Sequence, residues 1–453
     1  MIPRFLIAAA HKSSGKTVVS TGLARALRDR GLVVQGFKKG PDYIDPMWLA
    51  QASGRGCYNL DFNTMERAEI LRFYAGRARG DVALIESNKG LFDGVDLHGA
   101  DSNAAMAKLL RAPVVLVVDT SGTTRGIAPL LRGYQVFDPG VDIAGVILNK
   151  VGGPRHEAKL RAAVAEYTDL PVLGAVAKHP DLEIGERHLG LTTPGETGAL
   201  DAVIARIGQR IGAAVDLDAL LAIAARAPDL QAEPMPAVTP YAQGLRIGIP
   251  RDAAFGFYYP DDLERMRAAG AETVFFNALT DTKLPEVDGL FIGGGFPETS
   301  AAALAANGAL RGEIRAAIAA GMPVYAECGG LMYLCRTLAW QGETYPMVGA
   351  IAGDAVMCAR PQGRGYTRLK GAPDCPWDVG ATPFKAHEFH YARVENLPED
   401  ARYAFEVQRG AGITGTHDGI VVNNLLAGFC HMRHTEANPW VDRFLRYVMA
   451  CKG

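Results

Sequence analysis

The sequence predicts an α/β protein made of two doubly wound domains. At 453 residues the chain is long for one hydrophobic core, so two domains are expected. In each half, short apolar runs alternate with segments of helical periodicity, a pattern typical of mostly parallel sheets covered by helices. Between the halves, residues 228–244 contain four prolines and no periodicity. We therefore predict a first domain at 1–227, a linker at 228–243 and a second domain at 244–453.

The predicted strands are the apolar runs, taken in chain order. In the first half they are residues 4–10, 32–37, 82–86, 112–119, 143–149 and 171–176, with a helical segment at 17–30 after the first of them. In the second half they are residues 245–250, 273–278, 287–295 and 323–327, with one late strand near 421–431. Each domain therefore begins with a strand and continues as a strand–helix series.

Composition limits the classes of function. The chain is 48% hydrophobic and 21% charged, with a formal net charge of −2, so it gives no reason to expect nucleic-acid or broad membrane binding. No apolar run reaches the roughly 18–20 residues that cross a bilayer. Its seven cysteines are irregularly spaced and form no CxxC pair. We expect a cytoplasmic protein with free thiols and no structural zinc site.

A phosphate-binding loop is predicted at AAAHKSSGKT, residues 8–17. The usual pattern GxxxxGK[ST] has glycine where this chain has Ala10, but the rest fits and lies between a strand and a helix. The alternative is an ordinary strand–helix turn in which the sequence GKT occurs by chance. Backbone N–H groups of such a loop hold phosphates, and its lysine reaches the terminal ones. The expected ATP-binding residues here are Lys12, Ser13, Ser14, Gly15, Lys16 and Thr17.

Acidic side chains follow other strands at the edge where ligands bind in open α/β sheets. The Thr17 hydroxyl is placed for Mg²⁺, and Mg²⁺ usually needs one or two carboxylates as well. Glu86 ends a strand, Asp42 and Asp45 follow another, and Asp93 lies in a glycine-rich loop. We expect metal-binding or catalytic roles for these carboxylates. Asn149, at the end of the fifth run, is a candidate for contacting the adenine edge of ATP. The alternative is that Asn149 belongs to an Asn-Lys turn with a structural role only.

A second candidate site surrounds Cys328. This cysteine follows an apolar strand and precedes two glycines and a helix-like segment, the arrangement of a nucleophile elbow. A buried structural cysteine is the alternative. Gly294 and Gly295, in the loop GGGFPE, are suited to donate an oxyanion-hole N–H. His431 is the expected base, with His387 and His390 as competitors.

Taken together, these motifs resemble the cobyrinate a,c-diamide synthase family. The resemblance covers nearly the whole chain. It rests on SSGKT, GPDYIDP (40–46), NLD (59–61), the run from Glu86 to GLFDG, ERHLGLTTPGE (186–196), FYYPDDLE (257–264), GGGFPE (293–298), ECGGLMYL (327–334) and HEFHY (387–391). It implies a first domain similar to dethiobiotin synthetase, with a phosphate-loop sheet, and a second that is a class I, flavodoxin-like glutaminase.

The resemblance also implies a reaction. Glutamine would be hydrolysed at Cys328 through a thioester, with His431 carrying protons, and the ammonia would pass inside the protein to the first domain. There ATP and Mg²⁺ would activate a tetrapyrrole carboxylate as an acyl phosphate. The family's phosphate and metal groups fall on Lys38, Thr17, Asp42 and Glu86, and its substrate-orienting groups on Tyr43, Asp45 and Asp93. A homodimer is the default assembly.

Departures from the family pattern leave alternatives open. Lys39 and Lys89 replace other residues and add charge near the expected substrate carboxylates, so a sirohaem or metallated sirohydrochlorin is the alternative substrate. Arg433 stands two residues after His431, where a triad glutaminase has glutamate, so the prediction is a Cys–His pair whose third member is missing or comes from elsewhere. His434 is either its neighbour or a surface residue.

Two functions of other classes compete with this one. A phosphate-loop switch or partitioning ATPase would carry a signature lysine where this chain has His11. A stand-alone cysteine hydrolase with a vestigial nucleotide domain would be insensitive to ATP.

Overall fold

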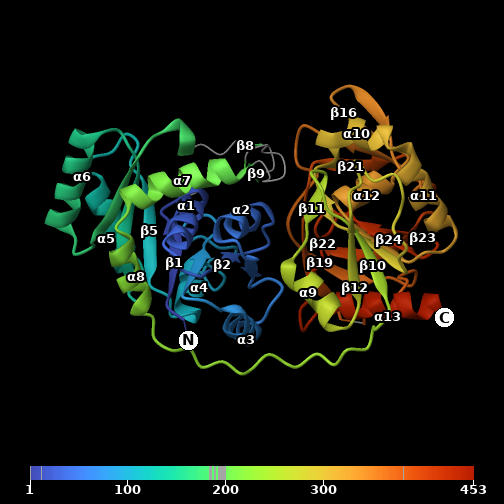
Figure 1. Ribbon diagram of the computed structural model, residues 1–453, viewed down its shortest axis with the longest axis horizontal. Helices are drawn as coiled ribbons and strands as arrows, with labels where there is room; N and C mark the ends of the chain where they lie inside the picture. The colour runs from blue at the N-terminus through green and yellow to red at the C-terminus, as the bar shows by residue number, and fades with distance from the viewer. Residues whose placement is uncertain (1, 12, 183–185, 188–189, 192–199, 381) are drawn as a thin grey trace. The chain divides into compact units, whose positions relative to one another are not determined.

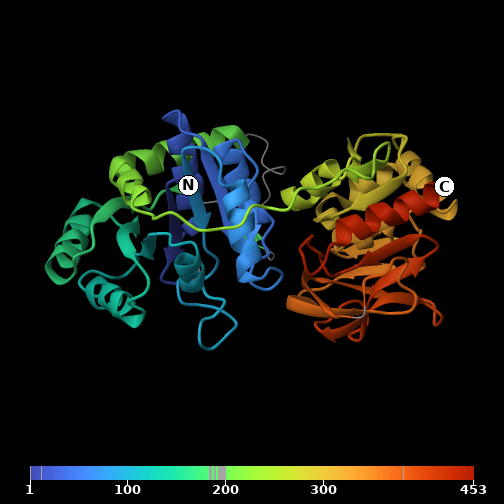
Figure 2. The same cartoon turned by 90° about the horizontal axis from the view of Figure 1, so that it is seen from below.

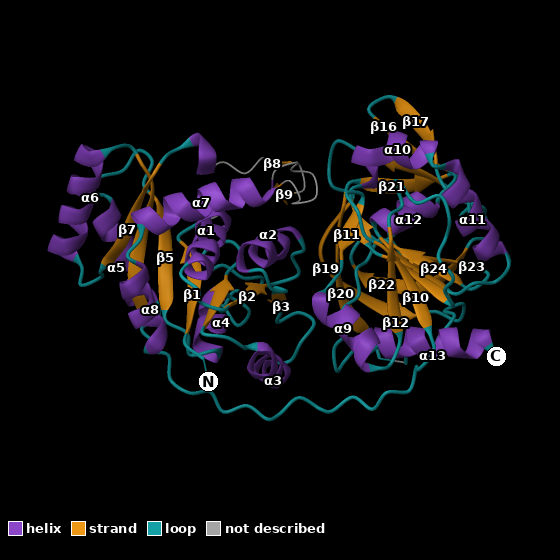
Figure 3. Ribbon diagram, in the orientation of Figure 1, coloured by secondary structure: helices purple, strands orange, loops and turns teal. Residues whose placement is uncertain are grey.

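A computed structural model describes residues 2–11, 13–182, 186–187, 190–191, 200–380 and 382–453. The chain forms two compact units, Met1–Pro236 and Ala237–Gly453, which we call unit 1 and unit 2 (Figure 1). Each unit contains a central sheet with helices packed around it (Figure 3). The predicted α/β fold class is confirmed.

Unit 1 is built on a seven-stranded sheet of order β3-β2-β4-β1-β5-β6-β7. All its pairings are parallel. The strands are β1 (Arg4–Ala9), β2 (Val34–Lys39), β3 (Tyr58–Leu60), β4 (Val82–Glu86), β5 (Val114–Asp119), β6 (Ile143–Val151) and β7 (Val172–Ala177). Every residue of β1, β2 and β4 is buried. Burial on both faces explains the nearly continuous apolar sequences of β1 and β4, whereas β2 also buries the polar residues Gln35, Lys38 and Lys39. The sequence missed only β3 among these strands, because three residues show no periodicity.

The helices of unit 1 connect these strands. They are α1 (Lys16–Asp29), α2 (Ile44–Ser53), α3 (Arg67–Arg77), α4 (Asn103–Leu109), α5 (Ile127–Phe137), α6 (Pro154–Tyr167), α7 (Leu200–Ala214) and α8 (Leu217–Ala225), with a 3-10 turn at Pro180–Leu182 and the short strands β8 (Glu186–Arg187) and β9 (Gly190–Leu191). Parallel strands joined in this way place all their carboxyl ends at one edge of the sheet.

Unit 2 has a nine-stranded sheet of order β12-β10-β13-β15-β24-β23-β22-β19-β20. The pairings from β12 to β24 are parallel, and the remaining ones are antiparallel. The parallel strands are β10 (Arg246–Pro250), β12 (Glu272–Phe276), β13 (Gly289–Ile292), β15 (Val324–Glu327) and β24 (Leu425–Gly428); the antiparallel ones are β19 (Gly363–Gly371), β20 (Phe384–His390), β22 (Arg402–Arg409) and β23 (His417–Val422).

Smaller elements complete unit 2. A pair of short strands, β11 (Phe255–Phe257) and β14 (Gly294–Gly295), and a four-stranded sheet of β16 (Thr337–Trp340), β17 (Glu343–Pro346), β18 (Asp354–Met357) and β21 (Ala392–Glu395) lie outside the main sheet. The helices are α9 (Pro260–Ala268), α10 (Ala301–Ala306), α11 (Gly308–Ala319), α12 (Gly329–Leu334) and α13 (Trp440–Lys452), with a 3-10 turn at Pro297–Ser300. In Figure 2, α13 runs to the C-terminus beside the sheet, and Trp440 and Phe444 join its core.

One predicted strand of unit 2 is divided between two strands in the structure. Residues 421–431 are a hairpin and its exit: β23 ends at Val422, Asn423 turns with φ 52°, and β24 pairs back from Leu425. An unbroken apolar run does not by itself distinguish one strand from two that meet at a tight asparagine turn. The turn matters because β24 then runs parallel to β15.

The segment between the units contacts unit 1 near residue 228 and unit 2 near residue 241, and most of residues 231–240 are exposed. Arg4 donates to the Pro228 carbonyl, and Leu230 packs on the core of unit 1. On the other side, the Tyr241 hydroxyl donates to Asp442 at 2.8 Å within unit 2. The division between the units, after Pro236, falls inside the predicted linker, whose exact bounds stay a prediction. No helix among the described residues combines the length and apolarity needed to cross a membrane.

Candidate functional site

The phosphate-loop candidate joins β1 to α1. Ser13 and Gly15 have positive φ angles of 64° and 83°, which turn the chain sharply before the helix begins at Lys16. A side chain at Gly15 would meet the Asn149 amide 2.3 Å from its Cβ, so glycine is required there. Asn149 donates through Nδ2 to the Ser14 carbonyl at 2.8 Å. Asn149 therefore lies against the loop, and its predicted contact with adenine stays a prediction.

Three predicted carboxylates gather around one buried lysine next to this loop. In the sheet register, Lys38 on β2 lies opposite Glu86 on β4, and its Nζ is 2.9 Å from Glu86 Oε1. Lys38 also donates to Asp45, and Asp42 Oδ2 lies 3.9 Å from its Nζ. Thr17 donates to Glu86 Oε1 at 2.9 Å, so the helix start belongs to the same cluster. The structure thus brings together every residue predicted to bind metal.

Burial and crowding perturb these groups. Burial, together with the Asp45 carboxylate, raises the pKa of Glu86, although Lys38 acts in the opposite direction. Partial burial and the Asp45 carboxylate raise the pKa of Asp42 to about 7. Burial opposes ionisation of Asp45, but Lys38 lowers the pKa of Asp45 below its usual value. Burial and the neighbouring Lys38 lower the pKa of Lys16 to about 8. Such perturbed groups at the carboxyl edge of a sheet are typical of functional sites.

The residues present fit a magnesium ion. The second carboxylate oxygen of Glu86, Oε2, is buried and has no hydrogen-bond partner among the described residues. A fully buried carboxylate oxygen in that condition is costly unless something binds it. Hard oxygen donors, here the carboxylates of Glu86 and Asp42 and the Thr17 hydroxyl, are the ligands that Mg²⁺ prefers.

The loop after β4 covers the lysine of the phosphate loop. Lys16 donates through Nζ to the Lys89 carbonyl at 2.7 Å, and Lys89 has a φ of 43°. Asp93 accepts from the Gly90 N–H at 2.9 Å, and a Cβ at Gly90 would lie 2.8 Å from the Ala10 carbonyl oxygen. Asp93 and the Lys89 backbone are therefore at the phosphate loop, whereas the Lys89 side chain is exposed to solvent.

The remaining predictions for unit 1 have different outcomes. Tyr43 is nearly buried and directly precedes α2, next to the carboxylate cluster in sequence. Lys39 is buried and donates to Asn88 Oδ1 at 3.4 Å, so its charge is inside the protein and not on its surface. Lys12 and most of the motif at 186–196 lie outside the described residues.

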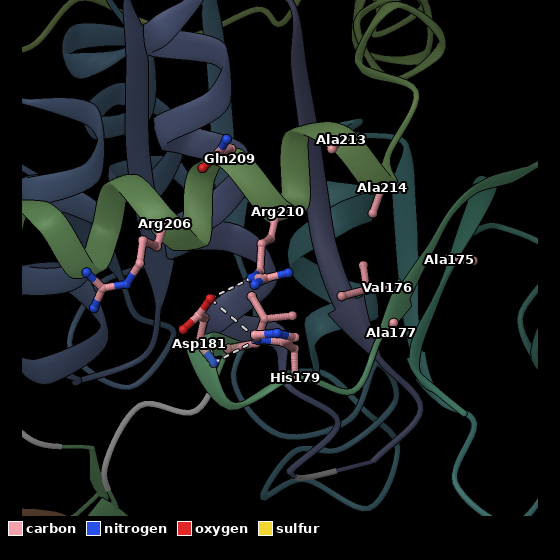
Figure 4. A pocket seen from close by; sticks show the side chains of 11 residues that line it. Ala175, Val176, Ala177, His179, Asp181, Arg206, Gln209, Arg210, Ala213 and Ala214 are labelled. Atoms are coloured by element: carbon pink, nitrogen blue, oxygen red, sulfur yellow. Dashed lines mark hydrogen bonds and ion pairs between the residues drawn. The ribbon is translucent and has the colours of Figure 1, made fainter. Parts of the chain in front are cut away.

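A cavity of about 710 Å³ lies at the carboxyl end of β7 (Figure 4). Asp181 is central to it: Arg210 donates to this carboxylate at 2.8 Å, and His179 Nδ1 lies 3.4 Å from it. Within the described part of the chain, none of the predicted site residues lines this cavity.

The candidate nucleophile of unit 2 has a strained backbone. Cys328 follows β15 directly, with φ 48° and ψ −102°, values that a residue with a side chain rarely adopts. Its N–H donates to the Gly428 carbonyl at 2.7 Å. A Cβ at Gly330 would lie 2.2 Å from the Ile292 carbonyl oxygen, so only glycine allows α12 to begin this close to β13. These features are those of a nucleophile elbow.

The structure brings His431 to this cysteine. β24 pairs parallel with β15 so that Gly428 lies opposite Glu327, and the chain after β24 leaves from the edge that carries Cys328. The side chains of His431 and Cys328 are hydrogen-bonded. Burial lowers the pKa of His431, but its hydrogen bonds to Cys328 and Glu327 outweigh burial and raise that pKa to about 10. This pairing places a proton acceptor directly beside the Cys328 thiol.

The other predicted residues of unit 2 surround this pair. A Cβ at Gly294 would lie 2.6 Å from His431 Cε1, and the N–H of Gly295 lies 3.0 Å from where a Cβ at Gly329 would be. His387 stacks on His431 with ring centroids 4.9 Å apart, and the two backbones pair in both directions. His390 instead stacks on Phe429 at 3.8 Å. Of the two competing histidines, only His387 touches the candidate base.

Sequence reasoning missed one contact. Glu327 Oε2 lies 3.3 Å from His431 Nδ1. Arg433, which occupies the position of the usual triad glutamate, donates instead to Asp261 at 3.1 Å, in a buried ion pair. The His434 N–H donates to Asp262, and burial lowers the pKa of His434 to about 4. The one sequence feature that could have pointed to a role for Glu327 was its position directly before Cys328.

Comparisons with known proteins agree with both sites. Residues 5–191 match the CobQ/CobB/MinD/ParA nucleotide binding domain, and residues 246–439 match the CobB/CobQ-like glutamine amidotransferase domain. A cobyrinate a,c-diamide synthase of Magnetococcus marinus is 45% identical over 98% of this chain and 97% of that protein. The chain belongs to the cobyrinate a,c-diamide synthase family.

Other members of the cobyrinate a,c-diamide synthase family also match over nearly the whole chain. The protein of Methanosarcina acetivorans is 41% identical, covering 95% of this chain and 92% of that protein. The protein of Archaeoglobus fulgidus is 40% identical, covering 100% of this chain and 98% of that protein. The predicted family is therefore confirmed, and with it the enzyme class, a ligase with a glutamine amidotransferase domain and a nucleotide-binding domain.

Proposed function

We propose that this chain amidates the a- and c-acetate carboxylates of cobyrinate or hydrogenobyrinate, using ATP and L-glutamine, as a step of cobalamin biosynthesis in the cytoplasm. The observation that carries the proposal is the hydrogen-bonded pair of Cys328 and His431 in a chain that also holds a phosphate loop among perturbed carboxylates. A glutaminase and an ATP site in one chain are the combination that glutamine-dependent amidation of a carboxylate needs.

In unit 2, the Cys328 thiolate attacks the carboxamide carbon of glutamine. The N–H groups of Gly294 and Gly295 are the proposed donors to the developing oxyanion. His431 delivers its proton to the leaving nitrogen, ammonia departs, and a γ-glutamyl thioester remains. Water then hydrolyses the thioester, with His431 taking its proton, to release glutamate and restore the thiolate.

In unit 1, a substrate carboxylate attacks the terminal phosphorus of ATP, ADP leaves, and the carboxylate becomes an acyl phosphate. Phosphorylation is needed because a carboxylate is a poor electrophile with a poor leaving group. Ammonia then attacks the acyl carbon, and phosphate leaves. Residues 12–17, with Lys38 and Asn149, are the proposed ATP site; Tyr43, Asp45, Lys89 and Asp93 are the proposed groups that orient the macrocycle carboxylate.

Mg²⁺ is the proposed metal, held by Thr17, Asp42 and Glu86. When bound, it neutralises charge on the transferring phosphate. Lys38 stabilises the same site, because its ammonium group lies among the three carboxylates and offsets their mutual repulsion. We also propose that the chain assembles as a homodimer.

The test supplies the enzyme with ATP, Mg²⁺ and glutamine against cobyrinate, hydrogenobyrinate and sirohaem in separate reactions. Mass spectrometry counts the hydroxyl groups replaced by amino groups. We expect two replacements on cobyrinate or hydrogenobyrinate and none on sirohaem. Turnover of sirohaem alone would overturn the proposed substrate in favour of the sirohaem-type alternative.

Two variants test the division of labour. Cys328→Ala should abolish glutamine-dependent turnover and leave ammonia-dependent amidation intact. Lys16→Ala should abolish both, because it disables acyl phosphate formation. A Cys328→Ala enzyme with full glutaminase activity would show that another group is the nucleophile.

A further inference from the structure

We propose that Glu327 is the positioning residue of the glutaminase site, so that Cys328, His431 and Glu327 act as a triad whose acid directly precedes its nucleophile. This inference rests on the proposed function, because it needs Cys328 and His431 to be the nucleophile and its proton carrier.

The carboxylate of Glu327 is rigidly held. It ends β15 and is only 2% exposed. Its Oε1 accepts from the Tyr325 hydroxyl at 2.6 Å and from the Met432 N–H at 2.8 Å. These two donors leave Oε2 facing His431 Nδ1, 3.3 Å away. The Met432 contact also ties the residue after the base to the same carboxylate.

This arrangement determines which nitrogen of His431 is the base. An ionised carboxylate only accepts hydrogen bonds, so Nδ1 must carry the hydrogen that faces Glu327. Nε2 is then left to take the proton of the Cys328 thiol. When it does so, the imidazolium has a negative charge on each side, one from the thiolate and one from Glu327. The positioning role of the acid in a serine triad is the same.

Other groups near His431 do not serve this role. Arg433 is engaged with Asp261, and its guanidinium lies over the Tyr259 ring at 5.0 Å. His387 covers the ring face of His431, but it meets the ring in a stack of 14° and not at Nδ1. Burial, with the charges of His431 and Arg433, lowers the pKa of His387, so this second ring stays neutral.

The competing interpretation is that Glu327 is structural and only satisfies Tyr325 and Met432. Two substitutions give opposite rankings under the two interpretations. In Glu327→Gln, the side-chain oxygen can still accept both hydrogen bonds, but the amide nitrogen would donate to Nδ1 and force the hydrogen onto Nε2. In Glu327→Asp, the negative charge remains, but the shorter side chain loses the fit to Tyr325 and Met432.

The experiment measures glutaminase kcat and KM, together with the pH dependence of Cys328 alkylation by iodoacetamide, in the full-length enzyme. We expect Glu327→Gln to lower kcat by roughly 10²–10⁴, the range that loss of a triad acid causes, with a smaller effect on KM. Its alkylation should begin at higher pH than in the wild type, because the imidazolium that stabilises the thiolate is weakened. Glu327→Asp should retain more activity than Glu327→Gln.

A matched control is Glu388→Gln. Glu388 is also buried in unit 2 and accepts hydrogen bonds from the N–H groups of Ala411 at 2.7 Å and Gly412 at 2.9 Å, with the Cys430 thiol 3.9 Å from its Oε2. Neutralising it should leave glutaminase kcat within a few-fold of the wild type. Circular dichroism of the Glu327 variants should match that of the wild type, which shows that they fold, and their ammonia-dependent amidation should be unchanged.

The inference is overturned if Glu327→Gln keeps the wild-type kcat and alkylation profile, or if it is more active than Glu327→Asp. Full glutaminase activity of Cys328→Ala would instead overturn the proposed function itself, so the two failures are distinguishable. If Glu327→Gln did not fold, wild-type kcat and alkylation in Glu327→Asp would support the inference, and a glutaminase activity as low as that of Cys328→Ala with a wild-type alkylation profile would overturn it.

Discussion

The ammonium nitrogen of Lys38 lies 2.9 Å from Oε1 of Glu86, and neither side chain is more than 2% exposed. The two residues are register neighbours on β2 and β4, so the sheet itself holds them together. Because Asp42 and Asp45 also face this ammonium group, Lys38 offsets the mutual repulsion of three carboxylates that share one site.

Removing that charge should therefore destabilise unit 1. Lys38→Met leaves buried carboxylates without their cation, and breaking a buried pair in this way typically costs about 3–5 kcal/mol. Chemical denaturation followed by circular dichroism measures the loss, and amidation with either nitrogen source should disappear. Lys39→Met is the control, because Lys39 is also buried but donates to the neutral Asn88 amide. Equal losses in both variants would contradict a special role for Lys38.

Binding of Mg²⁺ should depend on pH through Asp42. The pKa of Asp42 is raised to about 7 by partial burial and by Asp45, so the folded protein favours the protonated form. Its contribution to stability is full below the ordinary carboxyl pKa and is lost as pH rises through about 7. Because only the carboxylate binds metal, Mg²⁺ affinity should increase over the same range, with proton release.

Calorimetric titration of Mg²⁺ in the presence of ADP, in two buffers of different ionisation enthalpy, measures that proton release. Asp42→Asn should weaken binding and remove its dependence on pH near 7. A wild-type affinity that stays constant from pH 6 to pH 8 would count against this role of Asp42.

The close approach at Gly330 should be needed for glutamine use alone. A Cβ in Gly330→Ala would lie 2.2 Å from the Ile292 carbonyl oxygen, so the elbow must move. A misplacement of about 1 Å can lower a rate by roughly 10². We expect a loss of that order in glutamine-dependent turnover, with ammonia-dependent amidation preserved. Gly312→Ala, where a new Cβ meets no described atom within 4 Å, should leave both activities unchanged.

The His387 ring should support His431 by stacking and not by proton transfer. Aromatic pairs contribute about 0.5–1.5 kcal/mol, so His387→Ala should lower glutaminase kcat by roughly three- to ten-fold. His387→Phe keeps a neutral stacking ring and should retain most of the activity. Steady-state kinetics compares the two variants. If phenylalanine is as harmful as alanine, the ring nitrogens of His387 take part after all.

The sequence alone determined the parts of this protein that depend on local pattern. Continuous apolar runs located the parallel strands, since a strand buried on both faces has no polar alternation. The spacing of Gly15, Lys16 and Thr17 between a strand and a helix located the phosphate loop. Cys328 before paired glycines located the elbow, because tight turns and close approaches require residues without side chains.

Only the tertiary structure decided which residues meet across the chain. Lys38 faces Glu86 because the register of β2 and β4 places them side by side. Glu327 and His431 are 104 positions apart, and they meet because β24 turns back at Asn423 and pairs parallel with β15. Local periodicity carries no information about such pairing, which depends on the packing of whole strands. For this reason the sequence predicted a Cys–His pair, and the fold placed a glutamate beside it.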